Sequence, residues 1–297
     1  MDTLANLKAF LSVARAGSFT VAARELAVVP SVVTKRISQI EWRLKAALFE
    51  RTTRRVSLTP TGLHYLPAVQ RVVADADGLF DDFRESGQQL QGLLRVKVPG
   101  SLAVVLIGPL LNAFQAEHPM IQLEVMALDR SVNPIDEGFD IAITLLPQTF
   151  GGVVEEPLCI MPRMLCASPA YIARKGLPTH PKALAQHDIL NFLPTGNRWQ
   201  FESAAGAVVV DVHPRLATNE AQLLLQAALA GTGIAILSDY LARPAMDNGT
   251  LMPMLTDYPM VDLWVKALIP ENRIRVARVQ ALLQWLKIRL APKHEMA

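Results

Sequence analysis

Apolar residues in the first sixty positions recur at helical spacing in three separate segments. The first segment predicts an amphipathic helix that ends at Gly17, because glycine tolerates a left-handed cap. Its apolar members are Leu4, Leu7, Leu11 and Ala14. Ser18 is a suitable N-cap for a second helix over the sequence FTVAARELA, and a third helix is predicted from about Ser31 to Leu44.

The third helix is predicted to have an apolar back and a basic front. Its inward face is formed by Val33, Ile37, Ile40 and Leu44. Its outward face carries Val32, Lys35, Arg36, Gln39 and Arg43. A basic helix that follows a tight turn and another helix is the arrangement that places a recognition helix in the major groove of DNA. The next segment, LFERTTRRVSLT, predicts two short strands around a tip with Arg54 and Arg55, which forms a wing over the minor groove or the backbone.

From residue 60 to about residue 90, apolar residues alternate three and four apart, which is the spacing of a heptad seam. The seam residues are Leu66, Val69, Val73, Ala76, Phe80 and Phe83, and the opposite face is acidic. The pattern predicts a helix that pairs two chains. The alternative is that the seam is buried against the chain's own C-terminal domain. Pro67 should kink this helix or restrict it to the following residues.

Residue 92 begins a different pattern, in which buried-strand sequences alternate with helical ones. Strands are indicated by GLLRVKV, IQLEVMAL, DIAIT, PRMLCAS, DILNFL and IAIL, and long helices by LAVVLIGPLLNAFQAEHP and NEAQLLLQAALAGTG. This alternation predicts an α/β domain with mostly parallel sheets.

Charge is distributed unevenly along these segments. The formal net charge is +2, but residues 1–60 hold ten Lys and Arg against four Asp and Glu. Residues 61–91 hold two against five, and the remainder holds seventeen against eighteen. Positive charge is therefore concentrated in the N-terminal module, as expected of a module that binds a polyanion.

The N-terminus does not have the pattern of a signal peptide, since Asp2 replaces a basic n-region and Lys8 and Arg15 interrupt the apolar residues. A membrane-spanning helix needs about 18 consecutive apolar residues, and every stretch of that length in this chain is interrupted by a charged residue or a proline cluster. We therefore expect a cytoplasmic protein with no membrane partner.

The sequence shows no pattern of catalytic or metal-ligating residues. It has no P-loop, no Gly-x-Ser-x-Gly motif and no paired metal-ligand spacing among its six histidines. We expect no catalytic residue, no metal and no cofactor. Cys159 and Cys166 both lie in apolar runs, which favours buried, unreactive thiols over a redox-sensing pair.

The N-terminal segment resembles the signature of LysR-type transcriptional regulators over about sixty residues. The matching residues, in order, are Gly17-Ser18-Phe19, Ala22-Ala23, Leu26, Ile40-Glu41, Leu44, Leu48-Phe49, Arg51, Leu58-Thr59 and Gly62. The chain departs from the pattern at Val29-Pro30, where the family commonly has Ser-Gln, and at Lys45, where it commonly has glycine. Because a glutamine can read adenine and a proline cannot, Pro30 does not provide the base contact that a glutamine would make at this position.

The resemblance implies a set of DNA contacts. Residues expected near the bases are Ser31, Val32, Thr34 and Lys35, and those expected near phosphates or in the minor groove are Arg36, Arg51, Arg54 and Thr59. It also implies that the heptad segment is a dimerising linker helix, so that the protein is a homodimer or a homotetramer. RNA polymerase is a further candidate partner.

The remaining residues resemble the LysR effector domain, through Gly-x-Leu-Arg-Val, Phe114 with Pro119, Phe139-Asp140-Ile141-Ala142-Ile143 and Gly231-x-Gly233-Ile234-Ala235. The resemblance implies an α+β multidomain chain: a winged helix-turn-helix (1–60), a linker helix (61–91) and a two-lobed, periplasmic-binding-protein-like effector domain (92–297). Lobe one would comprise 92–162 and 266–297, and lobe two 163–265. A small molecule would bind between the lobes.

Candidate effector-binding residues are Ser101, Thr144, Thr195, Asn197, Arg198, Thr218 and Asn219. Thr144 stands where many relatives have arginine, so an anionic effector would need Arg130 or Arg198 for its charge. Two other functions were weighed, an enzyme and a solute-binding protein. The sequence has no catalytic pattern, which argues against an enzyme. It has no export signal and begins with a predicted DNA-binding module, which argues against a solute-binding protein.

Overall fold

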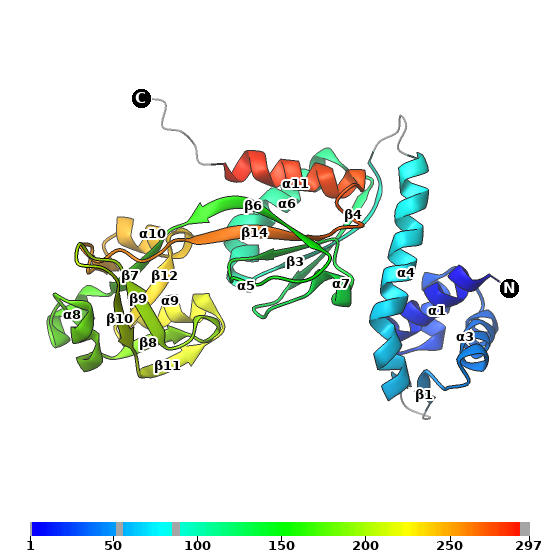
Figure 1. Ribbon diagram of the computed structural model, residues 1–297, viewed down its shortest axis with the longest axis horizontal. Helices are drawn as coiled ribbons and strands as arrows, with labels where there is room; N and C mark the ends of the chain where they lie inside the picture. The colour runs from blue at the N-terminus through cyan, green and yellow to red at the C-terminus, as the bar shows by residue number, and fades with distance from the viewer. Residues whose placement is uncertain (1, 52–55, 85–89, 292–297) are drawn as a thin grey trace.

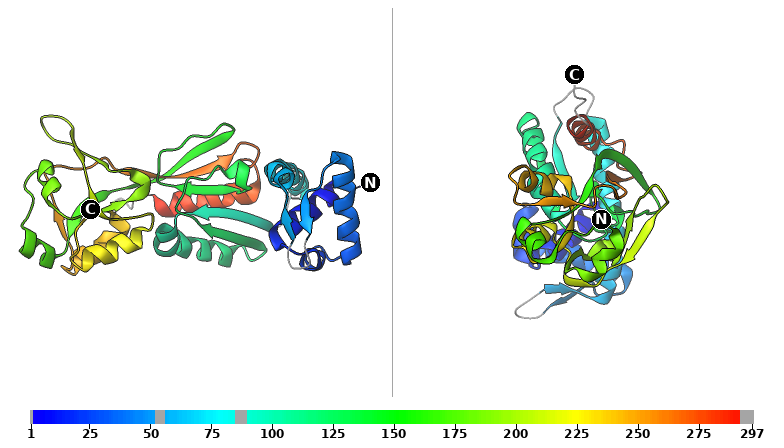
Figure 2. Two further views of the ribbon diagram at one scale, coloured as in Figure 1. Left: turned by 90° about the horizontal axis from the view of Figure 1, so that it is seen from below. Right: turned by 90° about the vertical axis from the view of Figure 1, so that its left-hand side faces the viewer.

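A computed structural model describes residues 2–51, 56–84 and 90–291 of the chain. The molecule is elongated. An N-terminal helical module, here called the reader, lies at one end, a long helix α4 (Pro60–Arg84) lies beside it, and two lobes follow in a row (Figures 1 and 2).

The reader has the helices and the hairpin that the sequence predicts. They are α1 (Thr3–Ala16), α2 (Phe19–Glu25), α3 (Pro30–Leu44), β1 (Phe49–Arg51) and β2 (Val56–Leu58). Gly17 ends α1 in the left-handed conformation at φ 59°, and Ser18 caps α2 by accepting from the backbone N–H of Val21 at 3.4 Å. Pro30 opens α3 at its first turn, where no intrahelical N–H bond is lost.

The packed faces of these helices differ partly from the prediction. In α3, Val33, Ile37 and Ile40 are buried as predicted, but Leu44 is exposed at the helix end. In α1 the most buried face comprises Asn6, Ala9, Phe10, Ser12 and Val13, whereas Leu4, Leu7, Leu11 and Ala14 are only half-buried. Leu7, Leu11 and Ala14 pack at the edge of the same core, whereas Ala9 and the polar residues Asn6 and Ser12 are buried in the contact with α2 and α3.

Helix α4 runs unbroken through Pro67, without the interruption that proline predicted. Leu66 and Val69 of the predicted seam pack against the reader's core, and Val73 is buried next to α1 and the first lobe. The side chains of Phe80 and Phe83 lie outside the described residues. The described start of the seam therefore packs on the N-terminal reader and not, as the alternative to pairing expected, on the C-terminal domain. Val73 lies between the reader and the first lobe.

The first lobe is built on a five-stranded sheet in the order β4-β3-β5-β14-β6. Its strands are β3 (Gly92–Val98), β4 (Ile121–Ala127), β5 (Ile141–Thr144), β6 (Val153–Met161) and β14 (Leu263–Pro270). The helical segments are α5 (Gly100–Leu102), the π-helical turn η1 (Ala103–Ile107), α6 (Gly108–Glu117), α7 (Pro134–Glu137) and α11 (Ala277–Leu290). Helices α6 and α11 pack on this sheet around Phe114 and Trp285 (Figure 1).

The second lobe has a sheet in the order β11-β8-β12-β7-β13. Its strands are β7 (Arg163–Ala167), β8 (Ile189–Phe192), β11 (Pro214–Thr218), β12 (Ile234–Ser238) and β13 (Met252–Met254), with a separate hairpin of β9 (Arg198–Phe201) and β10 (Val208–Asp211). The helices are α8 (Pro169–Lys175), α9 (Ala221–Leu229) and α10 (Asp239–Asp247), with short 3-10 turns η2 (Pro181–Gln186) and η3 (Leu193–Thr195).

Each sheet is mixed, and the expectation of mostly parallel sheets holds only for half of each. Strands β4, β3 and β5 are parallel, as are β11, β8 and β12. Strand β14 pairs antiparallel with β5 and with β6, and β7 pairs antiparallel with β12 and with β13. Strands β7 and β14 are the first strands after the two crossings between the lobes.

One apolar segment in the first lobe, Gly100–Glu117, is long and apolar enough to cross a membrane by length and composition. In the structure it is divided by the π-helical turn into α5 and α6. Leu102, Ile107 and Phe114 are fully buried in the lobe's core, so this segment serves as a core helix.

Candidate functional site

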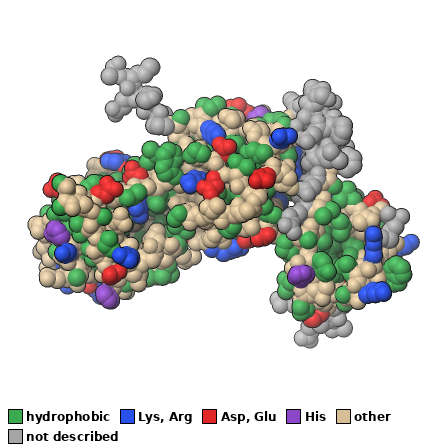
Figure 3. Space-filling model, in the orientation of Figure 1, with side chains coloured by type: hydrophobic (Ala, Val, Ile, Leu, Met, Phe, Trp, Pro, Cys, Tyr) green, Lys and Arg blue, Asp and Glu red, His purple; other side chains and the backbone are tan. Residues whose placement is uncertain are grey.

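The predicted recognition residues lie together on the first turns of α3. Ser31 and Lys35 are exposed, and Val32, Thr34 and Arg36 are half-buried. Lys and Arg side chains gather on the side of the reader that is turned away from the lobes (Figure 3). The apolar residues of α3 that pack on α1 and α2 therefore leave this basic face open to solvent.

The other residues predicted to contact phosphates or the minor groove do not lie on the exposed face of α3. Arg54 lies outside the described residues, as does the side chain of Arg51. Thr59 is buried, and its Oγ1 donates to the carbonyl of Ala47 at 2.7 Å and accepts from the N–H of Gly62 at 3.0 Å. We therefore correct the expectation for Thr59, because its hydroxyl caps the start of α4 and is not available to a phosphate.

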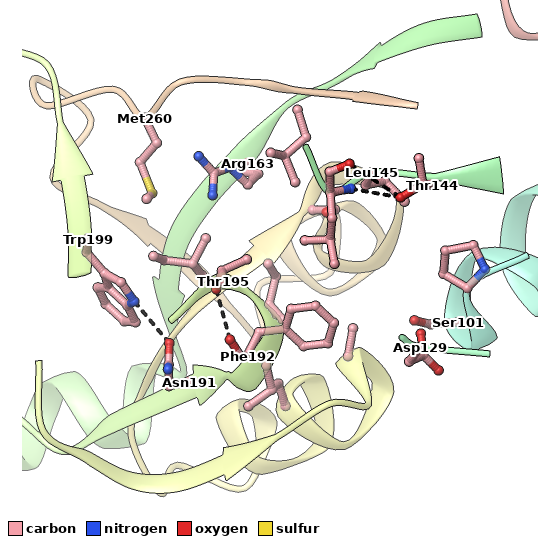
Figure 4. A pocket seen from close by; sticks show the side chains of 18 of the residues that line it. Ser101, Asp129, Thr144, Leu145, Arg163, Asn191, Phe192, Thr195, Trp199 and Met260 are labelled. Atoms are coloured by element: carbon pink, nitrogen blue, oxygen red, sulfur yellow. Dashed lines mark hydrogen bonds between the residues drawn. The ribbon is translucent and has the colours of Figure 1, made fainter. Parts of the chain in front are cut away.

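A cavity of about 300 Å³ lies between the two lobes. Figure 4 shows Ser101, Asp129 and Thr144 on one side and Trp199 and Met260 on the other. The two sides are also in direct contact, because the Tyr240 hydroxyl on α10 donates to Oγ of Ser101 on α5 at 3.3 Å. A volume of this size suits a small metabolite.

Four of the seven predicted effector residues line this cavity, namely Ser101, Thr144, Thr195 and Arg198. The structure places the other three, Asn197, Thr218 and Asn219, outside its lining. Asn197 accepts a hydrogen bond from Asn191 at 2.9 Å, and Thr218 accepts one from the backbone of Glu220 at 3.1 Å. These two side chains therefore hold the loops before β9 and α9.

Asn191 is a cavity residue that the sequence did not suggest. Its Oδ1 accepts from Nε1 of Trp199 at 3.0 Å, and its Nδ2 donates to the carbonyl of Gly196 at 3.0 Å. Both Asn191 and Trp199 are buried. This network holds the indole in place as a rigid apolar wall of the cavity.

Lys97 is the second lining residue that the sequence did not suggest. It lies in the middle of β3, is 2% exposed, and its Nζ donates to the carbonyl of Ile143 at 3.3 Å. Burial lowers the pKa of Lys97 to about 8, and the charge of Asp129 opposes this shift. A charged residue in a buried parallel strand breaks the apolar pattern of GLLRVKV, which was the available signal.

The other charges of the cavity are already partly engaged. Arg130 forms a bidentate pair with Glu137, with both nitrogen–oxygen distances at 2.6 Å. Arg163 donates through Nε to the carbonyl of Val261 at 3.1 Å, and burial lowers its pKa. Burial also raises the pKa of Asp129, which accepts from the N–H of Gly100 at 3.0 Å. The lining thus has more cationic than anionic side chains, which favours an anionic ligand.

The two cysteines lie in different lobes, Cys159 on β6 and Cys166 on β7. Burial raises the pKa of the Cys159 thiol, and it raises that of Cys166 to about 12. Both thiols are therefore protonated at neutral pH, which is the unreactive form. Within the described part of the chain, no group of three His, Cys, Asp or Glu residues could hold a metal ion.

Two family models match the chain. Residues 4–63 match the bacterial regulatory helix-turn-helix protein of the lysR family, and residues 87–291 match the LysR substrate binding domain. These matches cover the reader and both lobes.

Individual proteins are similar over the whole chain. An uncharacterized HTH-type transcriptional regulator, YhjC of Escherichia coli K12, is 32% identical over 96% of this chain and 97% of its own. The regulator DmlR of the same organism is 30% identical over 96% and 95% of the two chains. Among solved structures, CrgA, a LysR-type transcriptional regulator from Neisseria meningitidis, has a TM-score of 0.63 at 28% identity and covers 97% of this chain and 98% of that chain. ArgP of Mycobacterium tuberculosis has a TM-score of 0.69 at 18% identity over 97% of each chain, a similarity of fold.

We predict that Lys97→Met raises the free energy of unfolding by about 1–3 kcal/mol at pH 7, because it removes a buried charge and keeps the side-chain volume. The difference should shrink as pH rises. Folded Lys97 loses its proton near pH 8, whereas the unfolded side chain keeps its proton until about pH 10.4, so the unmodified protein gains stability in that interval. Denaturant unfolding at pH 7 and pH 9.5 measures both effects, and Lys182→Met on the exposed turn η2 is the control.

Proposed function

The chain belongs to the LysR family of transcriptional regulators, and from this premise we propose which of its residues contact DNA and which bind the effector. The reader binds operator DNA and the cavity between the lobes binds a small anion. The single observation that carries the second assignment is the buried cation Lys97 on the cavity floor.

The proposed DNA contacts begin at the N-terminal turns of α3. Ser31, Val32, Thr34 and Lys35 would face base edges in the major groove, and Arg36 would face a phosphate. The exposure of Ser31 and Lys35 and the basic face in Figure 3 support this assignment. Arg51 and Arg54 remain proposed contacts of the wing.

The proposed effector carries one anionic group and an apolar body. Its anion would pair with the Lys97 ammonium, next to the hydroxyls of Ser101 and Thr144, and its apolar part would lie against Trp199. Arg198 at the other end of the cavity could hold a second polar group. Because the cavity walls come from both lobes, an effector bound there changes the relative stability of closed and open lobes.

We propose that the protein works as a homodimer or homotetramer in the cytoplasm, by binding and not by catalysis, with RNA polymerase as a downstream partner. The dimer contact proposed here lies on a different face of α4 from the buried Val73. Tyr65 and Val72, two turns apart, are exposed, and Ala76 lies one turn further. This apolar stripe is free to pack against the same stripe of a second chain.

We predict that the affinity for operator DNA falls steeply with salt, with a slope of about −0.9 for each phosphate neutralised. Lys35→Ala should cost about 1–3 kcal/mol on the operator and less on unrelated DNA, because it removes a base contact. Gel shifts or fluorescence anisotropy at several salt concentrations measure both quantities, with Lys182→Ala as control. An operator affinity that is unchanged in Lys35→Ala would show that the register of the recognition helix is wrong.

For the effector, we predict that carboxylate metabolites titrate the fluorescence of Trp199 and shift the operator complex. Lys97→Met should weaken that binding about tenfold to a hundredfold, since it removes a charge-assisted hydrogen bond. Trp199→Phe identifies the origin of the signal. If Lys97→Met bound every responsive carboxylate as tightly as the unmodified protein, the anionic group would have to lie elsewhere.

For the oligomer, we predict opposite outcomes for two adjacent residues of α4. Val72→Asp should dissociate the dimer and leave the chain folded, because Val72 is half exposed. Val73→Ala should lower the melting temperature, because it removes buried methyl groups from the contact between α4 and the rest of the chain. Light scattering and circular dichroism separate the two effects. A Val72→Asp protein that stays dimeric would place the main dimer contact on the effector domain.

A further inference from the structure

A second cavity, of about 770 Å³, lies between the reader, α4 and the first lobe. One wall is formed by α1 and α2, through residues such as Lys8 and Arg15, and α4 adds Gln70. The opposite wall belongs to the first lobe, with Arg95 on β3 and Arg273 just before α11. Among the described residues, none lines both this cavity and the one between the lobes.

This cavity is strongly cationic. Its charged lining residues are Lys8, Arg15, Arg95, Arg273 and Arg278, against Glu25 and Asp140. Arg15 pairs with Glu25 at 2.9 Å, and Arg95 is engaged by Glu124 at 3.2 Å. The described lining residues thus comprise five cations and two anions, drawn from both the reader and the lobe.

Arg273 provides an independent observation at this cavity. Its side chain is 11% exposed, and its Nε lies 3.3 Å from Oδ1 of the buried Asp140. Its Nη1 is buried, and among the residues that the structure describes no group accepts a hydrogen bond from it. A buried guanidinium nitrogen without an acceptor is destabilising, so an acceptor at this point would be stabilising.

Asp140 does not supply that acceptor. Its Oδ2 accepts from the backbone N–H of Arg95 at 2.8 Å, and its Oδ1 faces Nε of Arg273. The carboxylate thus pairs with Nε of the guanidinium and leaves Nη1 without an acceptor. A planar guanidinium with an unused nitrogen fits an oxyanion such as a phosphate or a carboxylate.

We propose that this cavity is a second small-molecule site, which binds a multivalent oxyanion between the reader and the first lobe. One anionic group would accept from Arg273, and another would face Lys8 on the opposite wall. Such a ligand would bridge α1 and the lobe and hold the reader at a fixed orientation. It would therefore act on DNA binding independently of the effector between the lobes.

The test uses the full chain without DNA or effector, so its outcome is independent of the function proposed above. Pyrophosphate and citrate are titrated separately by calorimetry, with sodium chloride added to hold the ionic strength constant. Thermal melts accompany each titration. We expect one of the two anions to bind and to raise the melting temperature by about 5 °C at about one hundred times its Kd. The arm that binds distinguishes a phosphate-type from a carboxylate-type ligand.

Two variants and a matched control locate the binding. Lys8→Gln should weaken it about tenfold, and Arg273→Lys should do the same while keeping a cation next to Asp140. Lys35→Gln removes the same charge from the same module but on the DNA-binding face. Loss of binding in Lys35→Gln and not in Lys8→Gln would assign the anion to the DNA-binding face and overturn the proposal. The proposal would also be overturned if neither anion bound to the unmodified protein, or if Lys8→Gln and Arg273→Lys both bound the anion as tightly as the unmodified protein.

Discussion

The effector domain depends on one topological constraint: the chain crosses between its two sheets twice. It leaves the first sheet after Met161 and enters the second at Arg163, and it returns at Leu263. The first crossing is the single residue Pro162 and the second runs over residues 255–262 with a turn at Tyr258, so the lobes are held side by side but are not fused into one core. Their separate clusters of buried side chains leave the interface free to form a cavity.

Within that cavity, stability and binding oppose each other at Lys97. A charged ammonium in a buried strand is unfavourable in the empty protein, and burial lowers its pKa for that reason. An anion in the cavity would satisfy the same charge. A residue that weakens the fold can therefore be retained because it provides the affinity for the ligand.

Helix α4 connects the reader to this domain and is packed on two sides. It contacts α1 of the reader through Leu66 and Val69, and its middle lies against α7 of the first lobe. Gly138 at the end of α7 approaches Gln70 closely: a Cβ on Gly138 would lie 3.5 Å from Cδ of Gln70. The contact between reader and lobe is thus direct, and the cationic cavity lies in the same interface.

Local sequence determined the elements and their ends. Period, caps and glycine predicted α1 to α3 and the wing hairpin, because these depend on neighbours a few residues apart. The parallel halves of both sheets were expected from the alternation of strand and helix segments along the chain. Four of the seven residues proposed for the effector, chosen from their positions at strand and helix ends, line the cavity between the lobes. Only the tertiary structure decided which face of α1 and α4 is buried, that Thr59 is a cap, and that Lys97 and Asn191 line the cavity. Those outcomes depend on contacts between residues far apart in the chain, and the spacing of residues along the sequence does not predict such contacts.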